Sequence, residues 1–174
     1  TNLVDMGQGD PPGPFDYEAY LDFLERHHHN FFRLWREEQV FFLDDRFVVT
    51  PHPWQRTGPG KGLDGKPRFD LTKFEDVYFE RLRSRVQAAG QRGMYVAVML
   101  FEGWVLQQKK EWWRDHPFHP ENNINGVNGD ANGDGRGTEV HTLEVAAVTQ
   151  VQEAYVRRVI DAVGDLDNVL WEIS

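Results

Sequence analysis

Two glutamates stand where a carboxylate can do chemistry. Glu172 interrupts an otherwise apolar stretch, Asn168 to Ser174, that has the composition of a β-strand. A carboxylate in a buried strand needs a partner, because an isolated charge is costly to remove from water. Glu102 directly follows a second apolar stretch, residues 94–101. Both are candidates for catalytic carboxyls, although Glu102 suits a ligand or a structural hydrogen-bond acceptor better than an acid.

A loop in the last third of the chain matches the start of a calcium-binding loop. Asp130, Asn132 and Asp134 alternate in the pattern D-x-N-x-D-G, so their oxygens can wrap around a hard cation. The twelfth position of such a loop normally carries a bidentate glutamate, but here it is His141, and Glu139 comes two residues early. Two alternatives stay open, a calcium site made by Asp130, Asn132, Asp134 and Glu139, or a turn-rich loop that binds no ion.

Aromatic and histidine side chains gather at expected strand ends and in long loops. The aromatic fraction is 13% and includes six tryptophans, and flat rings of this kind stack on sugar rings. The candidates for lining a binding cleft are Trp35, His52, Trp54, Trp104 and His119. The alternative is that these rings pack within the loops, and the sequence does not separate the two.

The elements that must position these residues follow a regular order. Apolar residues at helical spacing predict helices at about residues 16–28, 69–91 and 143–163. We expect Asp16 to cap the first helix, and Asp70 or Thr72 to cap the second. Apolar runs predict strands at about residues 31–35, 94–101 and 168–174, with Leu3 and Val4 as the remnant of a first strand.

This alternation of strands and helices predicts right-handed βαβ units and a parallel sheet. Two long loops, residues 36–67 and 102–142, follow the C-terminal ends of strands, where the site of a (β/α) barrel is built. No glycine-rich phosphate loop follows any strand, which disfavours a doubly wound nucleotide-binding fold. We therefore expect residues 1–174 to form one domain, a parallel (β/α) half-barrel of about four strands and three helices.

Composition excludes several classes of protein. The chain has 174 residues, enough for one domain with a substantial core. Its net charge of -9 disfavours nucleic-acid binding, because phosphate would be repelled. It contains no cysteine, which excludes disulfides and thiolate chemistry, and no apolar run approaches the roughly 18 residues that span a bilayer.

Three strand sequences resemble a known family. Asn30 to Trp35, residues 94–101 and Asn168 to Ser174 resemble the second, third and fourth strands of retaining glycoside hydrolases with a (β/α)8 barrel, closest to cellulase-like and putative-glycosidase members. The resemblance implies a secreted or periplasmic protein acting on polysaccharide through a glycosyl-enzyme. It also implies that Arg33 lies at the substrate site and holds a catalytic carboxylate, and that Glu172 is a supporting residue. The alternative for Arg33, compatible with this role, is a salt bridge to Glu172, because a buried charge must be paired.

The same resemblance limits the expected activity. In the family, a segment like Trp171 to Ser174 is followed by Asn-Glu, whose glutamate is the acid/base, and the nucleophile lies on the seventh strand. Retaining hydrolysis needs two carboxyl groups about 5–5.5 Å apart. We therefore expect a glycosidase-related chain that lacks both of these glutamates, or alternatively a non-catalytic carbohydrate-binding protein. Because inner strand faces would be exposed, a second copy or a C-terminal half is the expected partner beside carbohydrate.

Overall fold

The structure is a computed structural model, and it describes residues 2–42 and 47–173. In chain order, these residues form β1 (Asp5–Gly7), α1 (Tyr17–Arg26), β2 (Phe31–Leu34), β3 (Phe41–Phe42), β4 (Phe47–Thr50), β5 (Trp54–Gln55), β6 (Asp70–Phe74), α2 (Asp76–Gln91), β7 (Tyr95–Met99), α3 (Trp104–Gln108), the 3-10 helices η1 (Lys110–Asp115) and η2 (Thr138–His141), α4 (Ala146–Val163) and β8 (Val169–Glu172).

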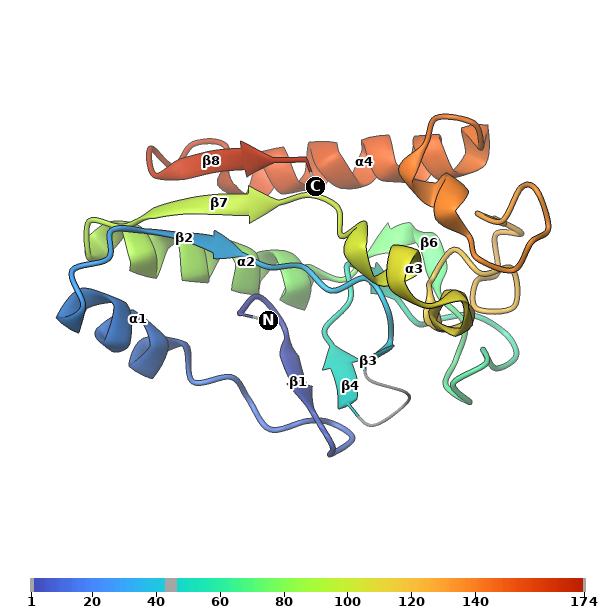
Figure 1. Cartoon of the computed structure of the whole chain (residues 1–174), viewed down its shortest axis with the longest axis horizontal. Helices are drawn as coiled ribbons and strands as arrows, with labels where there is room; N and C mark the ends of the chain where they lie inside the picture. The colour runs from blue at the N-terminus through green and yellow to red at the C-terminus, as the bar shows by residue number, and fades with distance from the viewer. Residues whose placement is uncertain (1, 43–46, 174) are drawn as a thin grey trace.

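The strands β2, β7 and β8 form a parallel sheet with β7 in the middle (Figure 1). Arg33 pairs with Ala97, and Ala97 pairs with Leu170, so the three strands share one register. Parallel neighbours need a long crossover, and here α2 leads into β7 and α4 leads into β8. The expectation of a parallel sheet therefore holds for these three strands.

The expected half-barrel is wrong. Among the described residues, the remaining strands form two antiparallel sheets, one with the order β1-β4-β3 and one made of β5 and β6. The strand near the N-terminus does not open the parallel sheet, because Met6 lies opposite Val49 in an antiparallel ladder. Its backbone groups find their partners in β4, part of a segment for which a loop was expected. The chain is therefore a mixed α/β domain with one three-stranded parallel sheet.

The helix predicted at residues 69–91 is wrong over its first part. Asp70–Phe74 is the strand β6, in which Phe74 pairs with Trp54 of β5, and α2 begins only at Asp76. Neither Asp70 nor Thr72 therefore caps the helix. Val77, expected on the buried stripe, is 53% exposed. Pairing with a distant strand has overridden the local helical spacing.

Both segments expected to be long loops contain short elements. Residues 36–67 include β3, β4 and β5, and residues 102–142 include α3, η1 and η2. The helices predicted at residues 16–28 and 143–163 are observed as α1 and α4. Asp16 caps α1 as predicted, because its side chain accepts from the Ala19 amide at 2.9 Å. Within the described part of the chain, no helix is both long and apolar enough to cross a bilayer.

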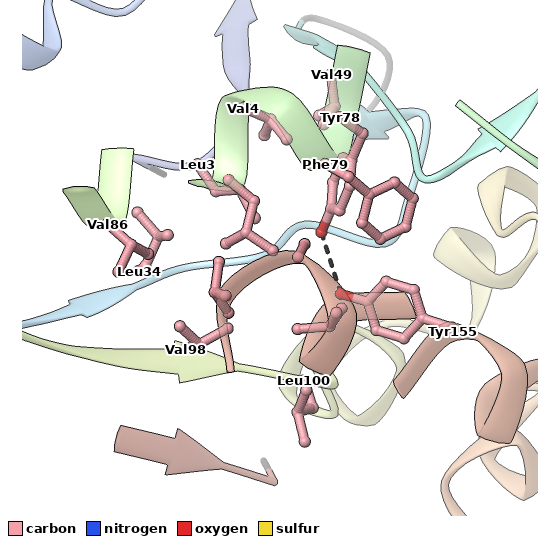
Figure 2. Close-up of a cluster of buried hydrophobic side chains, with 14 of the residues drawn as sticks. Leu3, Val4, Leu34, Val49, Tyr78, Phe79, Val86, Val98, Leu100 and Tyr155 are labelled. Atoms are coloured by element: carbon pink, nitrogen blue, oxygen red, sulfur yellow. Dashed lines mark hydrogen bonds between the residues drawn. The ribbon is translucent and has the colours of Figure 1, made fainter. Parts of the chain in front are cut away.

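The core lies between the parallel sheet and its helices (Figure 2). Leu34 and Val98 point from the sheet into this core, and both are almost completely buried. Tyr78 of α2 and Tyr155 of α4 share a hydrogen bond between their hydroxyls at 3.2 Å. Each large apolar side chain buried in this way contributes about 1.5–3 kcal/mol to stability. The two long helices are thus fixed to the same face of the sheet.

The opposite face of the parallel sheet is open. Phe31, Tyr95 and Leu170 are 51%, 50% and 48% exposed, and strand register places them on the same side as Arg33. We call this surface, formed by Phe31, Arg33, Tyr95 and Leu170, the uncovered sheet face. Large apolar residues gathered on one exposed surface are typical of a contact site rather than of a solvated one.

Candidate functional site

An ion pair crosses the uncovered sheet face. Arg33 Nη2 lies 2.6 Å from Glu172 Oε1, so these side chains of β2 and β8 meet across the middle strand β7. The register places Ala97 beside Arg33 and Met99 beside Glu172, so the ion pair runs diagonally across β7. The predicted pairing of Arg33 with Glu172 is confirmed. The Arg33 guanidinium also lies over the Trp35 ring, 5.2 Å from its centroid.

A pocket of about 460 Å³ opens where β2 ends. Its walls include Asn2, Phe15, Tyr20, Arg33, Trp35 and Glu37. We call it the sheet-end pocket. Four rings, from Phe15, Tyr20, Trp35 and Phe42, meet two charged side chains there. The pocket thus combines apolar rings with a few polar groups, as ligand sites commonly do.

Asn2 fixes the end of β2 beside this pocket. Its side-chain amide donates to the Arg33 carbonyl at 2.9 Å, and its side-chain oxygen accepts from the Trp35 amide at 2.7 Å. Both backbone groups belong to the point where the strand leaves the sheet. Asn2 therefore positions Trp35, and its own polar atoms are already engaged.

Glu37, Glu38 and Glu102 form a group of buried carboxyls after β2 and β7. Burial, reinforced by the neighbouring charge of Glu38, raises the pKa of Glu37 to about 7. Burial, reinforced by the charges of Glu38 and Glu37, raises the pKa of Glu102 to about 8. The Glu102 carboxylate accepts from the Trp104 amide at 2.8 Å and from the Val105 amide at 3.1 Å. Glu102 therefore accepts from the first amides of α3. This is the structural role that the sequence analysis preferred to that of a catalytic acid.

Glu38 has the opposite electrostatic environment. Burial favours its neutral form, but the charge of Arg36 and the nearby imidazoles of His116 and His141 outweigh burial and lower the pKa of Glu38 to about 2. Arg36 Nη2 lies 3.2 Å from Glu38 Oε1, and Nε2 of His116 and of His141 lie 3.6 and 3.9 Å from Glu38 Oε2. Arg36 thus supplies the positive charge of this cluster. Across the described ranges, no group of three or more His, Cys, Asp or Glu residues is arranged to hold a metal ion.

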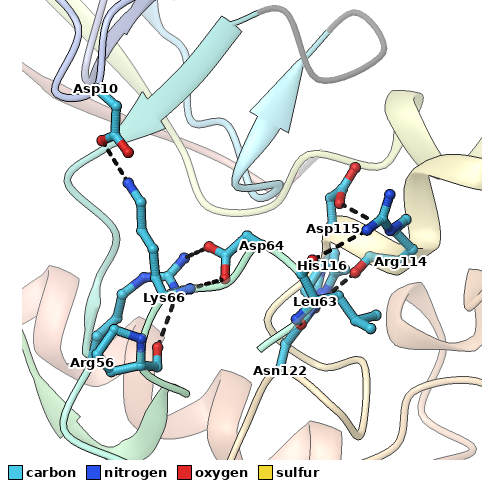
Figure 3. A network of polar contacts seen from close by, with 10 residues as sticks. Asp10, Arg56, Leu63, Asp64, Lys66, Arg114, Asp115, His116 and Asn122 are labelled. Carbon is cyan, nitrogen blue, oxygen red and sulfur yellow. Dashed lines mark hydrogen bonds and ion pairs between the residues drawn. The ribbon is translucent and has the colours of Figure 1, made fainter. Parts of the chain in front are cut away.

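His52 and Trp54 lie in a different pocket, of about 330 Å³, at the start of α2. Its walls also include Arg56, Phe69, Glu75 and Val77, and we call it the α2 pocket. Arg56 is held in place by Asp64, whose carboxylate accepts from Nη2 at 2.6 Å (Figure 3). The guanidinium lies 4.0 Å from the centroid of the Phe69 ring. Three of the predicted cleft residues therefore divide between two pockets, Trp35 in the sheet-end pocket and His52 and Trp54 in the α2 pocket.

The two remaining cleft candidates lie in neither pocket. Trp104 is 50% exposed at the start of α3, where its ring lies near that of Trp112. His119 forms part of its own loop, since its Nδ1 accepts from the Glu121 amide at 3.2 Å and its ring packs on Trp113. The loop-packing alternative describes His119 better than the cleft interpretation does.

The loop considered for calcium is closed by its own hydrogen bonds. Asp130 Oδ2 accepts from the Gly135 amide at 2.9 Å, and Asn132 Oδ1 accepts from the Asp134 amide at 2.8 Å. Asn132 also donates to Glu139 Oε1 at 2.6 Å, which brings the early glutamate to the loop as expected. Among the described residues, Asp130 Oδ1 and Glu139 Oε2 lack a hydrogen-bond partner. The geometry favours the turn alternative, and calcium binding stays a prediction.

Comparison with known proteins assigns the chain to a protein family. Residues 45–174, about three quarters of the chain, match the model of a family described as Domain of unknown function (DUF6298). The chain belongs to this family. No curated protein and no solved structure matches the chain.

The DUF6298 match divides the two pockets. The lining residues of the α2 pocket, Thr50 to Val77, all fall within the DUF6298 segment, whereas the sheet-end pocket is lined by residues that precede it.

The sequence analysis did not predict three of the pocket residues, Glu37, Asn2 and Arg56. Glu37 had a signal, because it belongs to the run Arg-Glu-Glu-Gln directly after the second predicted strand. Asn2 and Arg56 had none, since only the folded chain brings them to their pockets.

Proposed function

We propose that this DUF6298 domain is a glycosidase-related protein that binds carbohydrate in the sheet-end pocket. The proposal is carried by the make-up of this pocket, in which the Trp35 ring lies beside Arg33 and Glu37 at the end of a parallel strand. Aromatic rings offer a flat apolar surface, and the charged groups offer hydrogen bonds that fix the orientation of a ligand. The resemblance of the strand sequences to retaining glycoside hydrolases supports the same ligand class.

Each polar group of the pocket has a distinct task in this proposal. Arg33 is held by Glu172, so its remaining N–H groups present a fixed pattern of donors. The pKa of Glu37 is about 7, so near neutral pH this residue exists both as a carboxyl and as a carboxylate. It can therefore donate to one sugar hydroxyl or accept from another. The same groups would also serve a protein that binds carbohydrate without hydrolysing it.

Replacing Trp35 by alanine should weaken binding of a neutral oligosaccharide by about 30-fold, because removal of a central aromatic contact typically costs 2 kcal/mol or more. Isothermal titration calorimetry with xylan- and cellulose-derived oligosaccharides measures the change. Trp171→Ala is the matched control, since Trp171 is 46% exposed and its strand register places it on the other side of the sheet from Arg33. Equal binding by wild type and Trp35→Ala would reject the proposal.

An assay on aryl glycosides separates a glycosidase from a binding protein. The resemblance leads us to expect no turnover from this chain. Turnover that disappears in Glu172→Gln or Glu102→Gln would instead make this domain a hydrolase, with the replaced glutamate as a candidate catalytic group.

We also expect a homodimer in solution, because the uncovered sheet face is apolar and half-exposed. Light scattering after size exclusion, at micromolar concentration, should give twice the chain mass. Leu170→Glu should shift the protein to a monomer by placing like charges at the contact, whereas Leu143→Glu, at a residue that is 84% exposed beside α4, should not. A wild-type monomer at every concentration would contradict the expectation and favour a different partner for the face.

A further inference from the structure

Glu37 is a buried carboxyl group that faces the sheet-end pocket without a partner. The residue is only 7% exposed, and it lines the pocket. Among the described residues, its side chain forms neither a hydrogen bond nor an ion pair. Its oxygens are not among the unpartnered polar atoms that are sealed from solvent. A ligand in the sheet-end pocket can therefore reach this carboxyl group.

The arginines nearest to Glu37 in the sequence are engaged elsewhere. Arg33 Nη2 lies 2.6 Å from the Glu172 carboxylate, so the pair as a whole adds little charge to the pocket. Arg36 Nη2 lies 3.2 Å from the Glu38 carboxylate, and both of these side chains are 2% exposed. Both positive charges are thus compensated before they act on Glu37.

The charges that do act on Glu37 are mostly negative. Burial raises its pKa to about 7, with Glu38 acting in the same direction and the amino-terminal charge against it. Glu37 in turn raises the pKa of Glu102, so these two carboxyls also repel each other. An ionised Glu37 is therefore costly, because a buried charge needs a counter-ion. A ligand hydroxyl offers it a hydrogen bond, whereas a ligand cation also offers the missing charge.

The rings of the sheet-end pocket favour a cation as well. The faces of aromatic rings carry negative potential and attract ammonium groups, and aromatic cages bind ligand cations in this way. The Trp35 ring already attracts one cation, since the Arg33 guanidinium lies 5.2 Å from its centroid. The rings that line the pocket beside Glu37 are those of Phe15, Tyr20, Trp35 and Phe42.

We propose that the sheet-end pocket selects a sugar that carries a protonated amine, as a hexosamine does, with Glu37 as the counter-ion of the ammonium group. The inference rests on the proposed function for the sugar and adds the charge of that sugar. In this arrangement the ammonium group donates to the Glu37 carboxylate while the sugar ring packs on Trp35. Arg33 stays paired with Glu172 and donates to a hydroxyl of the same ligand.

Three disaccharides that differ only at the second carbon of each ring separate charge from shape. Cellobiose carries a hydroxyl there, the β-1,4-linked glucosamine dimer carries an amine, and the N-acetylated dimer carries a neutral amide. In calorimetric titrations at pH 7, the glucosamine dimer should bind about 5- to 10-fold more tightly than cellobiose, because a hydrogen bond between charged groups is about twice as strong as a neutral one. The N-acetylated dimer should show no such gain.

Glu37→Gln tests which group holds the ammonium. Glutamine keeps the size of the side chain and its hydrogen bonding but removes the charge. The measured quantity is the ratio of the affinities for the glucosamine dimer and for cellobiose, which should fall to about one whatever happens to sugar binding in general. Glu144→Gln makes the same chemical change at an exposed residue that does not line the pocket, and it should keep the ratio of the wild type.

Proton release by the wild type gives a readout that needs no variant. At pH 7 about half of Glu37 is protonated, and an ammonium group beside it favours the carboxylate, so binding of the glucosamine dimer should release protons. Cellobiose carries no charge and should release fewer. Titrations in two buffers of different ionisation enthalpy measure the difference, and equal proton release by the two sugars contradicts the role of Glu37 as counter-ion.

The outcomes separate this inference from the proposed function. Equal affinities of the wild type for cellobiose and the glucosamine dimer overturn the inference and leave the proposed function standing. A preference for the amine that persists in Glu37→Gln also overturns it, because another group then holds the ammonium. Absence of binding by all three sugars overturns both. A preference that disappears in Glu37→Gln but not in Glu144→Gln supports the inference.

Discussion

Replacing Arg36 by methionine should lower the free energy of unfolding by about 3–5 kcal/mol near pH 7, because it leaves a buried charge without its partner. Arg36 is 2% exposed, donates to the Leu100 carbonyl and lies 4.0 Å from the centroid of the Tyr155 ring. Its main partner is Glu38, whose pKa of about 2 depends on the arginine. Methionine fills the space but cannot offset the carboxylate.

Urea unfolding followed by circular dichroism measures this change. Because the pKa of Glu38 is lowered from its ordinary 4.5 to about 2, its contribution is present above about pH 4.5 and is lost as the pH falls towards 2. That acid-sensitive part should be missing in Arg36→Met. Adding Glu38→Gln to Arg36→Met should recover part of the loss, since the lone charge is then removed as well.

Arg157→Met is the matched control for Arg36→Met. The Arg157 side chain is 77% exposed and pairs with Glu153 at the surface, so the change should stay within about 0.5 kcal/mol. A loss below about 1 kcal/mol in Arg36→Met would mean that the buried pair contributes little and that the cluster relaxes around a neutral Glu38.

Replacing Glu102 by glutamine should stabilise the protein at alkaline pH, by roughly 3–5 kcal/mol near pH 9. The pKa of Glu102 is raised from 4.5 to about 8, so the folded protein favours the neutral carboxyl. The resulting stability is complete below about pH 4.5 and is lost as the pH rises through 8. Glutamine is neutral throughout, and its oxygen can still accept from the two amides at the start of α3.

Urea unfolding of both proteins between about pH 5 and pH 9 tests this prediction, because the stability of the wild type should fall over that interval and the variant should fall less. Glu37 contributes to the same trend through its pKa of about 7, so the variant should keep some pH dependence. Glu144→Gln, at an exposed position, should behave as the wild type does. Parallel curves for Glu102→Gln and the wild type would show that Glu102 is not destabilised by its charge.

The sequence was informative where the signal is local. Eight consecutive apolar residues predicted the middle strand, observed as β7, and the apolar stripe from Val148 to Val163 predicted α4. It failed where pairing with a distant segment decides. Phe74, Val77 and Tyr78 lie at helical spacing, yet the strand that ends at Phe74 pairs with β5. Asp5 to Gly7 joins β4 for the same reason, and this pairing is what invalidates the barrel expectation.

The candidate site shows the same division. Arg33, Trp35 and Glu172 lie on predicted strands, so register brings them together as expected. Which loop residues join them depends on how residues 36–67 fold back, and spacing carries no information on that path. His52 and Trp54 both line a pocket, but the sequence could not show that this pocket is separate from the one that Trp35 lines.

The register of the parallel sheet also has a kinetic consequence. Arg33 pairs with Ala97, and Ala97 pairs with Leu170, so each crossover joins residues more than sixty positions apart. Contacts of this range must overcome the entropy of closing a long loop before they gain any stability, and folding slows accordingly. Antiparallel pairings such as Phe42 with Phe47 are separated by only a few residues. We therefore expect the ladder between β3 and β4 to form early, and the sheet that carries Arg33 and Glu172 to be assembled last.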